Sequence, residues 1–406
     1  MRLLHTADWH LGHTLYDHDR QAEHEHFLRW LQDSLGEHGV DALVIAGDVF
    51  HTANPPVKAT SAWFSFLAST RSRYPDLDIV VVGGNHDSAT RLDAPNPILA
   101  ELGVHVIGGL PFRSGRAIDT RRVVLPLTRD GEVRAWIAAL PYLRVSDLPP
   151  VGDHEDAVRE GLRVLHAQVF ESLRRRAQPG QALLATGHLG LEGARYSQDS
   201  ERRVVASERP LNDQVFPPDL AYVALGHLHL AQSVSGRENV RYCGSPIPLS
   251  MTERDYPHQV LLVDLDGEDF VSATPLPVPR LVDMLRVPQD FQPLAQVLQL
   301  LQALPDRQIQ DVPERLPFLE VRVLLTAPRP GLRQAVEKAL EGKRARLVRI
   351  NIQSQGSGLA LADVHPEALR ELNPEQVFRR RYDQAHQSEP PEDLLAAFRE
   401  LVGDLP

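Results

Sequence analysis

The sequence predicts an α/β protein with two sheets, followed by a small α+β domain and C-terminal helices. Three observations support this fold class. Apolar strand-like runs alternate with helix-like segments in the first half of the chain, prolines then punctuate the sequence near residue 275, and two amphipathic helical patterns close the chain. Alternation of strands and helices is typical of parallel sheets that are covered by helices.

The first elements form a βαβαβ pattern. Strands are expected at the apolar runs 2–6, 41–46 and 79–82. Such unbroken runs are typical of strands that are buried on both faces of a sheet. Helices are expected between them, at 19–38 and around 63–67, because apolar residues recur there at helical spacing. In a sheet of this kind, ligand-binding groups collect beyond the carboxyl ends of the strands.

The pattern continues into the middle of the chain. A helix is expected at 155–176, and further strands at 104–107, 123–127, 133–140, 182–185 and 221–225. Two later strands, 240–243 and 259–263, suggest a second sheet. Pro275, Pro277 and Pro279 predict a linker after Ala273, and we place a domain boundary there, so the first domain is expected at 1–275.

A small domain is expected at 280–355. Helical and alternating apolar spacings predict the order helix, strand, helix, strand, at residues 294–301, 319–325, 332–340 and 347–352. The remaining segment, 360–406, predicts two helices with apolar faces, and these faces need to be covered. The cover is either the domain to which they belong or a partner protein.

Charge and cysteine content exclude several classes of protein. The 406 residues include 43 Lys and Arg against 54 Asp and Glu, a net charge of −11, which argues against coating nucleic acid or an anionic membrane by bulk charge. The single cysteine, Cys243, excludes an internal disulfide or a thiolate cluster and fits a reducing, cytoplasmic compartment. No run approaches the roughly 18 apolar residues of a membrane span, so no membrane contact is expected.

Polar side chains with metal-binding atoms follow several of the predicted strands. They are Asp8 and His10, Asp48, Asn85 and His86, His188, and His227 and His229. Carboxylate, amide and imidazole donors without thiolate suit Mn²⁺, Fe²⁺ or Zn²⁺ better than Ca²⁺ or Cu⁺. Because the donors outnumber one tetrahedral site, two ions that share a carboxylate are expected, the arrangement that hydrolyses phosphoesters.

Each motif taken alone has a simpler interpretation. A single histidine after a strand, such as His188, usually caps or packs. His227 and His229 project to one side of an extended chain, which surface alternation also produces. The segment 84–87 contains Gly and Asn, which favour turns. The joint occurrence of these motifs at successive strand ends is what predicts a metal site.

The first two-thirds of the chain resemble the calcineurin-like metallophosphoesterase superfamily. The resemblance rests on five motifs in this order: D-x-H, G-D, G-N-H-D, G-H and G-H-x-H. The segments around them, HTADWHLG, AGDVFHTANPP, GGNHDS, YVALGHLH and RYCGSPIPLS, are similar to the SbcD family of bacterial nuclease subunits. This resemblance implies a two-sheet α/β/β/α metallophosphoesterase sandwich, with a capping domain at 280–355 over the nuclease site.

The resemblance also implies a role for each matched residue. One ion would be held by Asp8, His10, Asp48 and His229, and the other by Asp48, Asn85, His188 and His227. Both ions are expected to be Mn²⁺. His86 would be the catalytic histidine, Asp87 would orient it, and His51 would lie near the substrate phosphate. The remaining nearby histidines are expected to be structural or surface residues: His5, His13 and His18.

The function implied by the resemblance is a DNA nuclease that acts in end processing, repair and recombination. It would cleave single strands and hairpins endonucleolytically and degrade duplex ends from 3′ to 5′, in a heterotetramer of two copies each of itself and the ATPase SbcC. The helices of 360–406 would bind the SbcC coiled-coil base. The chain contains no GxxxxGK[ST] motif, so ATP hydrolysis is expected from the partner.

Two alternatives stay open on the sequence. The first is a small-molecule phosphodiesterase of the same superfamily, and the second is a scaffold that keeps the fold without the chemistry. The basic runs 174–176 and 202–203 are candidate phosphate contacts, although short arginine runs are usually solvated faces.

Overall fold

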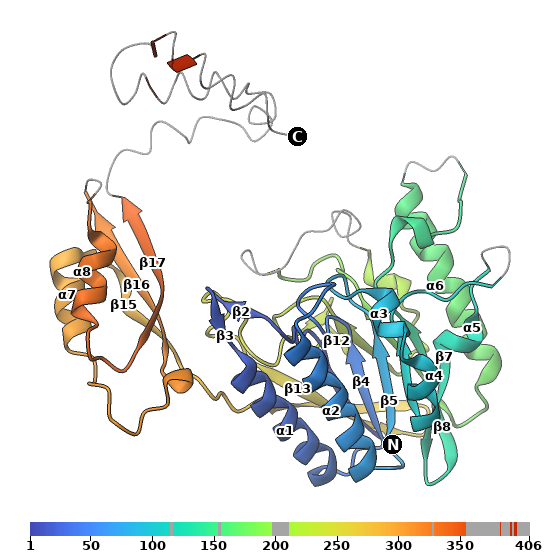
Figure 1. The fold of residues 1–406 in the computed structure, drawn as a ribbon. Helices are drawn as coiled ribbons and strands as arrows, with labels where there is room; N and C mark the ends of the chain where they lie inside the picture. The colour runs from blue at the N-terminus through green and yellow to red at the C-terminus, as the bar shows by residue number, and fades with distance from the viewer. Residues whose placement is uncertain are drawn as a thin grey trace.

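The computed structural model describes residues 1–113, 117–152, 156–196, 211–326 and 329–354, together with residues 382, 390, 391, 394 and 395. They form a two-sheet domain and a smaller three-stranded domain, which is coloured orange in Figure 1. Apart from the five isolated positions, the helices expected in 360–406 lie outside the described residues. Within the described ranges, no helix combines the length and apolar character needed to cross a membrane.

The first sheet has the strand order β14-β13-β1-β4-β5-β6. Its parallel strands are β1 (Arg2–Thr6), β4 (Ala42–Ala46), β5 (Asp78–Val82) and β6 (Val104–Ile107). Helices α1 (Gln21–Glu37) and α2 (Val57–Arg73) connect β1 to β4 and β4 to β5. The predicted βαβαβ unit is confirmed. A short hairpin, β2 (Thr14–Leu15) and β3 (His18–Asp19), precedes α1, and the short helices α3 (Ala89–Asp93) and α4 (Asn96–Leu99) precede β6.

The second sheet has the strand order β11-β12-β10-β9-β8-β7. Its strands are β7 (Val124–Arg129), β8 (Glu132–Leu140), β9 (Ala182–His188), β10 (Tyr222–Gly226), β11 (Gln232–Val234) and β12 (Arg237–Tyr242). The one-turn helix α5 (Thr120–Val123) leads into β7, and the long helix α6 (Ala157–Arg176) leads into β9. The four central strands β8, β9, β10 and β12 are parallel, so their carboxyl ends share one edge.

The two sheets pack face to face. Because successive side chains of a strand point to opposite sides, each sheet has one face toward the other sheet and one face toward helices. Val44 and Val80 belong to one buried cluster with residues of the second sheet, such as Val223. Their neighbours Ile45 and Val81 instead pack against residues of α1 and α2. In Figure 1, α1 and α2 lie on one side of this domain and α6 lies on the other. The α/β/β/α layer order implied by the family resemblance is therefore confirmed.

Two expectations for the later strands are wrong. The segment 259–263 belongs to β13 (Gln259–Asp266), which pairs antiparallel with β1 in the first sheet and does not join β12 in the second. The linker expected after Ala273 is the second half of β14 (Asp269–Pro277). Its prolines are tolerated because β14 is an edge strand, where a missing backbone N–H leaves no neighbouring strand unpaired.

The small domain is a parallel sheet with two helices on one face. Its strands are β15 (Met284–Pro293), β16 (Phe318–Leu325) and β17 (Arg346–Ser354), and its helices are α7 (Leu294–Gln302) and α8 (Leu332–Ala339). The helices cover the face that carries Leu319, Val321 and Val323, on the side away from the first domain (Figure 1). Four of these elements were predicted, whereas β15 was missed because Pro288 and polar residues interrupt its apolar pattern.

Candidate metal centre

The carboxyl ends of five strands bring the predicted site residues to one edge of the sandwich. The strands β1, β4 and β5 of the first sheet and β9 and β10 of the second end there, and β4 contacts both β9 and β10. The side chains that follow or end these strands are Asp8, His10, Asp48, Asn85, His86, His188, His227 and His229. Residues far apart in the sequence therefore meet where the two sheets face each other.

Five of these side chains form a continuous buried cluster. The ligand atoms of Asp8, His10 and His229 all lie within 4.8 Å of one another, and so do those of Asp8, Asp48 and His188. Asp8 belongs to both groups, and none of the five residues is more than 3 % exposed. Each group could hold one ion. Oδ2 of Asp48 also lies 3.5 Å from Nε2 of His10, so Asp48, like Asp8, adjoins both positions.

Asn85 and His227 extend the cluster on the side of the second sheet. The side-chain oxygen Oδ1 of Asn85 lies 3.0 Å from Nε2 of His188 and 3.1 Å from Nδ1 of His227. Nε2 of His188 also lies 3.4 Å from Oδ2 of Asp48. The other ring nitrogen of His188, Nδ1, lies 2.9 Å from the carbonyl oxygen of Ala46 and donates to it, so Nε2 is directed into the cluster.

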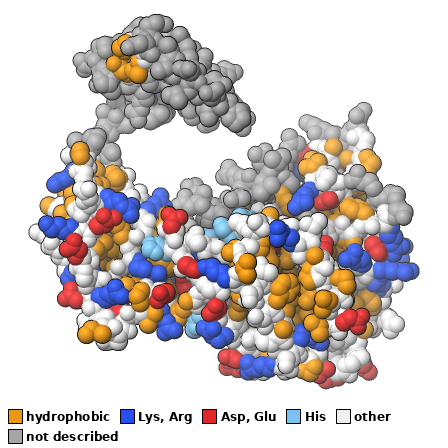
Figure 2. All heavy atoms as spheres, viewed as in Figure 1, with side chains coloured by type: hydrophobic (Ala, Val, Ile, Leu, Met, Phe, Trp, Pro, Cys, Tyr) orange, Lys and Arg blue, Asp and Glu red, His pale blue; other side chains and the backbone are white. Residues whose placement is uncertain are grey.

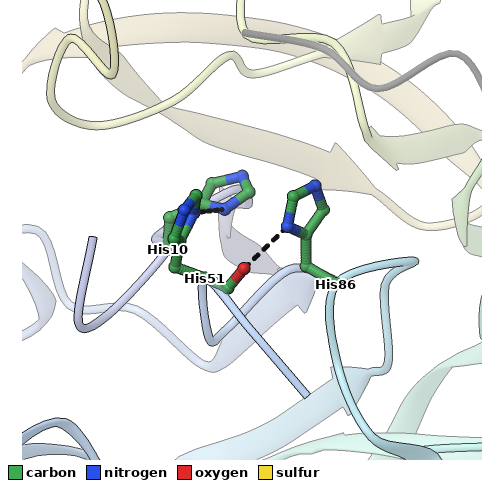
Figure 3. Close-up of side chains that lie close together, drawn as sticks. All are labelled: His10, His51 and His86. Carbon is green, nitrogen blue, oxygen red and sulfur yellow. Dashed lines mark hydrogen bonds between the residues drawn. The ribbon is translucent and has the colours of Figure 1, made fainter. Parts of the chain in front are cut away.

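His51 and His86 lie beside His10, as Figure 3 shows. Nδ1 of His86 donates to the carbonyl oxygen of His51 at 2.7 Å, and Nδ1 of His51 lies 3.4 Å from Nδ1 of His10. The ligand atoms of these three histidines also lie within 4.8 Å of one another. Because the backbone of His51 occupies Nδ1 of His86, the Nε2 atom of His86 is the one that a substrate can meet.

Asp87 ties two of the site loops together. Its carboxylate accepts hydrogen bonds from the backbone N–H groups of Val49 at 3.1 Å, Phe50 at 2.9 Å and Gly84 at 2.9 Å. Burial and the charge of Asp48 raise the pKa of Asp87 to about 7. These contacts hold the segment that carries Asp48 against the segment that carries His86.

Burial and mutual contact set the protonation of the cluster. Burial raises the pKa of Asp8 to about 6. Burial also opposes ionisation of Asp48, yet His188 beside it holds the pKa of Asp48 below its ordinary value. Burial lowers the pKa of His227 to about 3 and that of His10 well below its ordinary value. Neutral imidazoles and ionised carboxylates are the forms in which these side chains bind metals. His188 differs from His10 and His227: burial lowers its pKa, but the charge of Asp48 and the hydrogen bonds of the ring together outweigh burial and raise it to about 9, so metal binding there would release a proton.

Several cluster residues have unusual backbone conformations. Asp8, His10 and Asp48 have φ angles of 55°, 47° and 49°, in the left-handed region that non-glycine residues seldom occupy. Hydrogen bonds between the two loops maintain them, because the N–H groups of Asp8 and His10 donate to the carbonyl oxygens of Gly47 and Asp48, both at 3.0 Å. Strain of this kind concentrates at functional sites.

The glycines of two motifs are required by close approach. A Cβ atom on Gly84 would lie 2.1 Å from Oδ1 of Asp48, and one on Gly226 would lie 1.9 Å from the carbonyl oxygen of Ala46. Glycine in G-N-H-D therefore lets the loop after β5 approach the loop after β4 within the first sheet, and glycine in G-H-x-H lets β10 of the second sheet approach β4 of the first.

Trp9, between Asp8 and His10, anchors the first loop. Its indole is fully buried, with ring centroids 5.4 Å from Phe27, 5.7 Å from Trp63 and 5.3 Å from Phe66. The ring N–H donates to Oγ1 of Thr6 at 2.9 Å. The sequence analysis assigned no role to Trp9. An aromatic residue between two candidate metal ligands is nevertheless a signal that the loop is anchored in the core.

The other nearby histidines have separate environments. His5 is buried, and its Nδ1 lies 3.0 Å from the hydroxyl of Tyr222, which is a structural role as expected. His18 lies 5.8 Å from Phe318 between ring centroids. His13 borders the site, because its ring centroid is 4.6 Å from that of His51.

The basic run 174–176 is engaged within the protein. Arg174 pairs with Asp219 at 2.6 Å, Arg175 lies 3.6 Å from Glu171, and Arg176 donates to the carbonyl oxygen of Val124. Basic and acidic side chains are interspersed on the face shown in Figure 2. Each arginine of the run thus has a partner within the protein, and 202–203 lies outside the described residues.

The chemistry of the cluster fits divalent metal ions. Nε2 of His10 is buried without a hydrogen-bond partner among the described residues, 3.5 Å from Oδ2 of Asp48. Buried polar atoms are normally hydrogen-bonded, so an orphaned imidazole nitrogen beside a carboxylate is explained by a ligand role. Nitrogen and oxygen donors without sulfur suit Mn²⁺, Fe²⁺ or Zn²⁺.

This fold and this cluster define a calcineurin-like phosphoesterase domain. Residues 1–231 match the family model described as calcineurin-like phosphoesterase. Residues 280–386 match the model described as type 5 capsule protein repressor C-terminal domain.

Curated relatives narrow the family further. The chain is 41% identical over 389 residues to SbcD of the nuclease SbcCD from Rhodobacter capsulatus, with 93% of each chain covered. It is 31% identical to SbcD of the nuclease SbcCD from Escherichia coli strain K12, with 94% of this chain and 92% of that protein covered. A solved structure of a putative 5′-nucleotidase from Staphylococcus aureus is 12% identical and covers 68% of this chain and 54% of that chain, with a TM-score of 0.42. The chain belongs to the SbcD family, and the resemblance seen in the motifs is confirmed.

Proposed function

We propose that this protein is a metal-dependent DNA nuclease subunit that works with an SbcC-type ATPase. The observation that carries the proposal is the buried cluster of Asp8, His10, Asp48, His188 and His229 at the carboxyl ends of the strands. The names of the relatives, as SbcD components of a nuclease SbcCD, support the substrate and the partner. The enzyme is a phosphodiesterase whose two metal positions adjoin.

The ligands divide into two sets. We assign one ion to Asp8, His10, Asp48 and His229, and the other to Asp48, Asn85, His188 and His227. The close approach of Asn85 to His188 and His227, at 3.0 and 3.1 Å, supports the second set. Mn²⁺ is the ion we propose for both positions. When bound, the two ions supply Lewis acidity toward the phosphodiester and activate water at neutral pH.

Three further side chains act on the substrate or its surroundings. Nδ1 of His86 is held by the carbonyl oxygen of His51, which leaves Nε2 as the ring nitrogen for the substrate. There His86 can protonate the leaving oxygen or stabilise phosphoryl charge. His51 lies on the same side and contacts the phosphate. Asp87 positions His86 through the backbone of the loop that it holds.

The substrates we propose are single-stranded and hairpin DNA, cut endonucleolytically, and duplex ends, degraded from 3′ to 5′ in end processing, repair and recombination. A net charge of −11 supports DNA binding with the help of a partner. We propose a heterotetramer of two copies of each subunit, a dimer of this chain within it, and binding of segment 360–406 to the SbcC coiled-coil base. Such a complex would act on DNA in the cytoplasm.

Cleavage of an end-labelled DNA hairpin in Mn²⁺ tests the proposal. The purified chain is assayed alone and with its SbcC-type partner and ATP, and Asp48→Asn is the matched control that keeps the size of the side chain. We expect cleavage by the native chain and its loss in the variant. Hydrolysis of a small aryl phosphodiester without DNA cleavage under either condition would favour a small-molecule phosphodiesterase instead.

A further inference from the structure

Glu253 contacts one of the cluster histidines and was not found from the sequence. Its side chain is fully buried, and Oε1 accepts a hydrogen bond from Nδ1 of His229 at 2.8 Å. Its other oxygen, Oε2, accepts one from the backbone N–H of Leu249 at 2.8 Å. A carboxylate on Nδ1 fixes the proton there and leaves Nε2 of His229 for the group with Asp8 and His10.

The turn that carries Glu253, residues 248–254, is closed by a hydrogen bond of its own and is held by two further side chains of the first domain. The N–H of Glu253 donates to the carbonyl oxygen of Ser250 at 3.2 Å, and Nε2 of His258 lies 2.9 Å from the carbonyl oxygen of Glu253. The buried guanidinium of Arg20 donates to the carbonyl oxygen of Pro248. These bonds place the carboxylate of Glu253, so its contact with His229 is a built feature of the fold.

The small domain holds the same turn from the other side. Nη2 of Arg286, on β15, donates to the carbonyl oxygen of Met251 at 3.1 Å, while its Nε lies 2.5 Å from the buried carboxylate of Glu320. The side chain of Met251 is itself buried in one cluster with Met284 and Phe318 of the small domain. The residue two positions before Glu253 is thus packed against the second domain.

From these contacts we propose that Glu253 is a positioning residue for His229 and that the small domain sets its place through the 248–254 turn. The inference rests on the metal site proposed above. Movement of the small domain would displace Met251 and, through the turn, Glu253, which lies two residues further along the chain. The orientation of His229 and the affinity for the ion that it holds would then depend on a domain that supplies none of the proposed ligands.

Calorimetric titration with Mn²⁺ tests the first half of this proposal. Glu253→Ala removes the acceptor of the His229 proton, whereas Glu253→Gln retains an acceptor oxygen at the same position. Partners of metal-ligating histidines contribute about 10- to 100-fold in affinity, so we expect Glu253→Ala to weaken one of two Mn²⁺ sites by that factor and Glu253→Gln to restore part of it. Unchanged binding at both sites in folded Glu253→Ala would overturn the positioning role.

A pair of arginine variants tests the second half. Arg286 and Arg322 both approach Glu320, at 2.5 and 3.5 Å, but Arg286 also donates to Met251, whereas Arg322 donates to the carbonyl oxygen of Gln289 within the small domain. We expect Arg286→Ala to weaken the same Mn²⁺ site as Glu253→Ala and Arg322→Ala to leave it unchanged. Equal Mn²⁺ affinities in both arginine variants would refute control by the small domain.

The same titration separates this inference from the proposed function. Native protein that binds two Mn²⁺ ions but cleaves no DNA with its partner would overturn the proposed activity and leave the role of Glu253 to be judged by the variants. Native protein that binds no Mn²⁺ would overturn both.

Discussion

Replacement of Gly84 by alanine tests whether the carboxylate of Asp48 must occupy its observed position. A Cβ atom there would lie 2.1 Å from Oδ1 of Asp48 and 2.4 Å from its backbone nitrogen, whereas ordinary contacts begin at 3.4 Å. One of the two loops must therefore move by about 1 Å to relieve the overlap. The hydrogen bond from the backbone N–H of His86 to Oδ1 of Asp48, now 2.8 Å long, would be disturbed by the same movement.

The expected loss follows from the place of Asp48 in both proposed ligand sets. A misplacement of about 1 Å in a reacting site can reduce the rate about 100-fold. We therefore expect DNA cleavage by Gly84→Ala to fall about 100-fold at a fixed Mn²⁺ concentration. Both Mn²⁺ affinities should weaken together, unlike the single site affected by Glu253→Ala.

Hairpin cleavage and Mn²⁺ titration measure this effect, and Gly161→Ala is the matched control. Gly161 lies in α6, where an added Cβ atom would meet its nearest neighbour, Cβ of Leu148, at 3.1 Å. We expect that variant to cleave DNA at the native rate. If folded Gly84→Ala retained native cleavage and Mn²⁺ affinity, the position of Asp48 would not control the site, and our reasoning would be refuted.

Three further predictions concern packing and pH. Burial lowers the pKa of His166 to about 4. As pH falls, the unfolded chain therefore binds a proton at this histidine before the native state does. The free energy of unfolding should fall by up to about 3 kcal/mol between pH 6.5 and 4. His166→Leu should remove that part of the pH dependence in urea unfolding. Trp9→Ala should lower the free energy of unfolding by about 3–5 kcal/mol and reduce Mn²⁺ affinity, because its indole supports the Asp8 loop. Phe318→Ala should destabilise the contact between the domains, which limited proteolysis would reveal as earlier cleavage.

Each of these has an outcome that contradicts it. If His166→Leu lost as much stability between pH 6.5 and 4 as the native protein, protonation of groups other than His166 would be responsible for the loss. Trp9→Phe is the control that keeps an aromatic ring. Equal Mn²⁺ affinity in Trp9→Ala and Trp9→Phe would show that aromatic packing under the Asp8 loop does not affect metal binding. For Phe318, whose ring lies under Arg20 at 5.6 Å and Arg346 at 4.1 Å, native-like resistance to protease would show that the arginines hold the domains without it.

Short-range patterns were sufficient to identify the strands that carry the site. Apolar runs such as 41–46 and 79–82 end directly before polar motifs, so Asp48 and Asn85 could be placed at strand ends from the sequence alone. The residues of a strand do not show which other strand it pairs with. For that reason β13 was predicted to lie in the same sheet as β12, although it pairs with β1. A strand that is buried on both faces has the same apolar sequence pattern in either sheet, so the pattern could not assign β13 to the first sheet.

The amino-acid sequence by itself determined the βαβαβ unit, the donor types of the cluster and the family to which they belong, because each depends on residues close together in the chain. Only the tertiary structure decided which donors meet, why Gly84 must lack a side chain, and that Glu253 lies against His229. Those contacts join loops that are far apart in the sequence, and their distances depend on how the strands and the two sheets pack. The residues next to Glu253 in the chain do not show that this acidic side chain is buried, and its burial is a property of the folded protein.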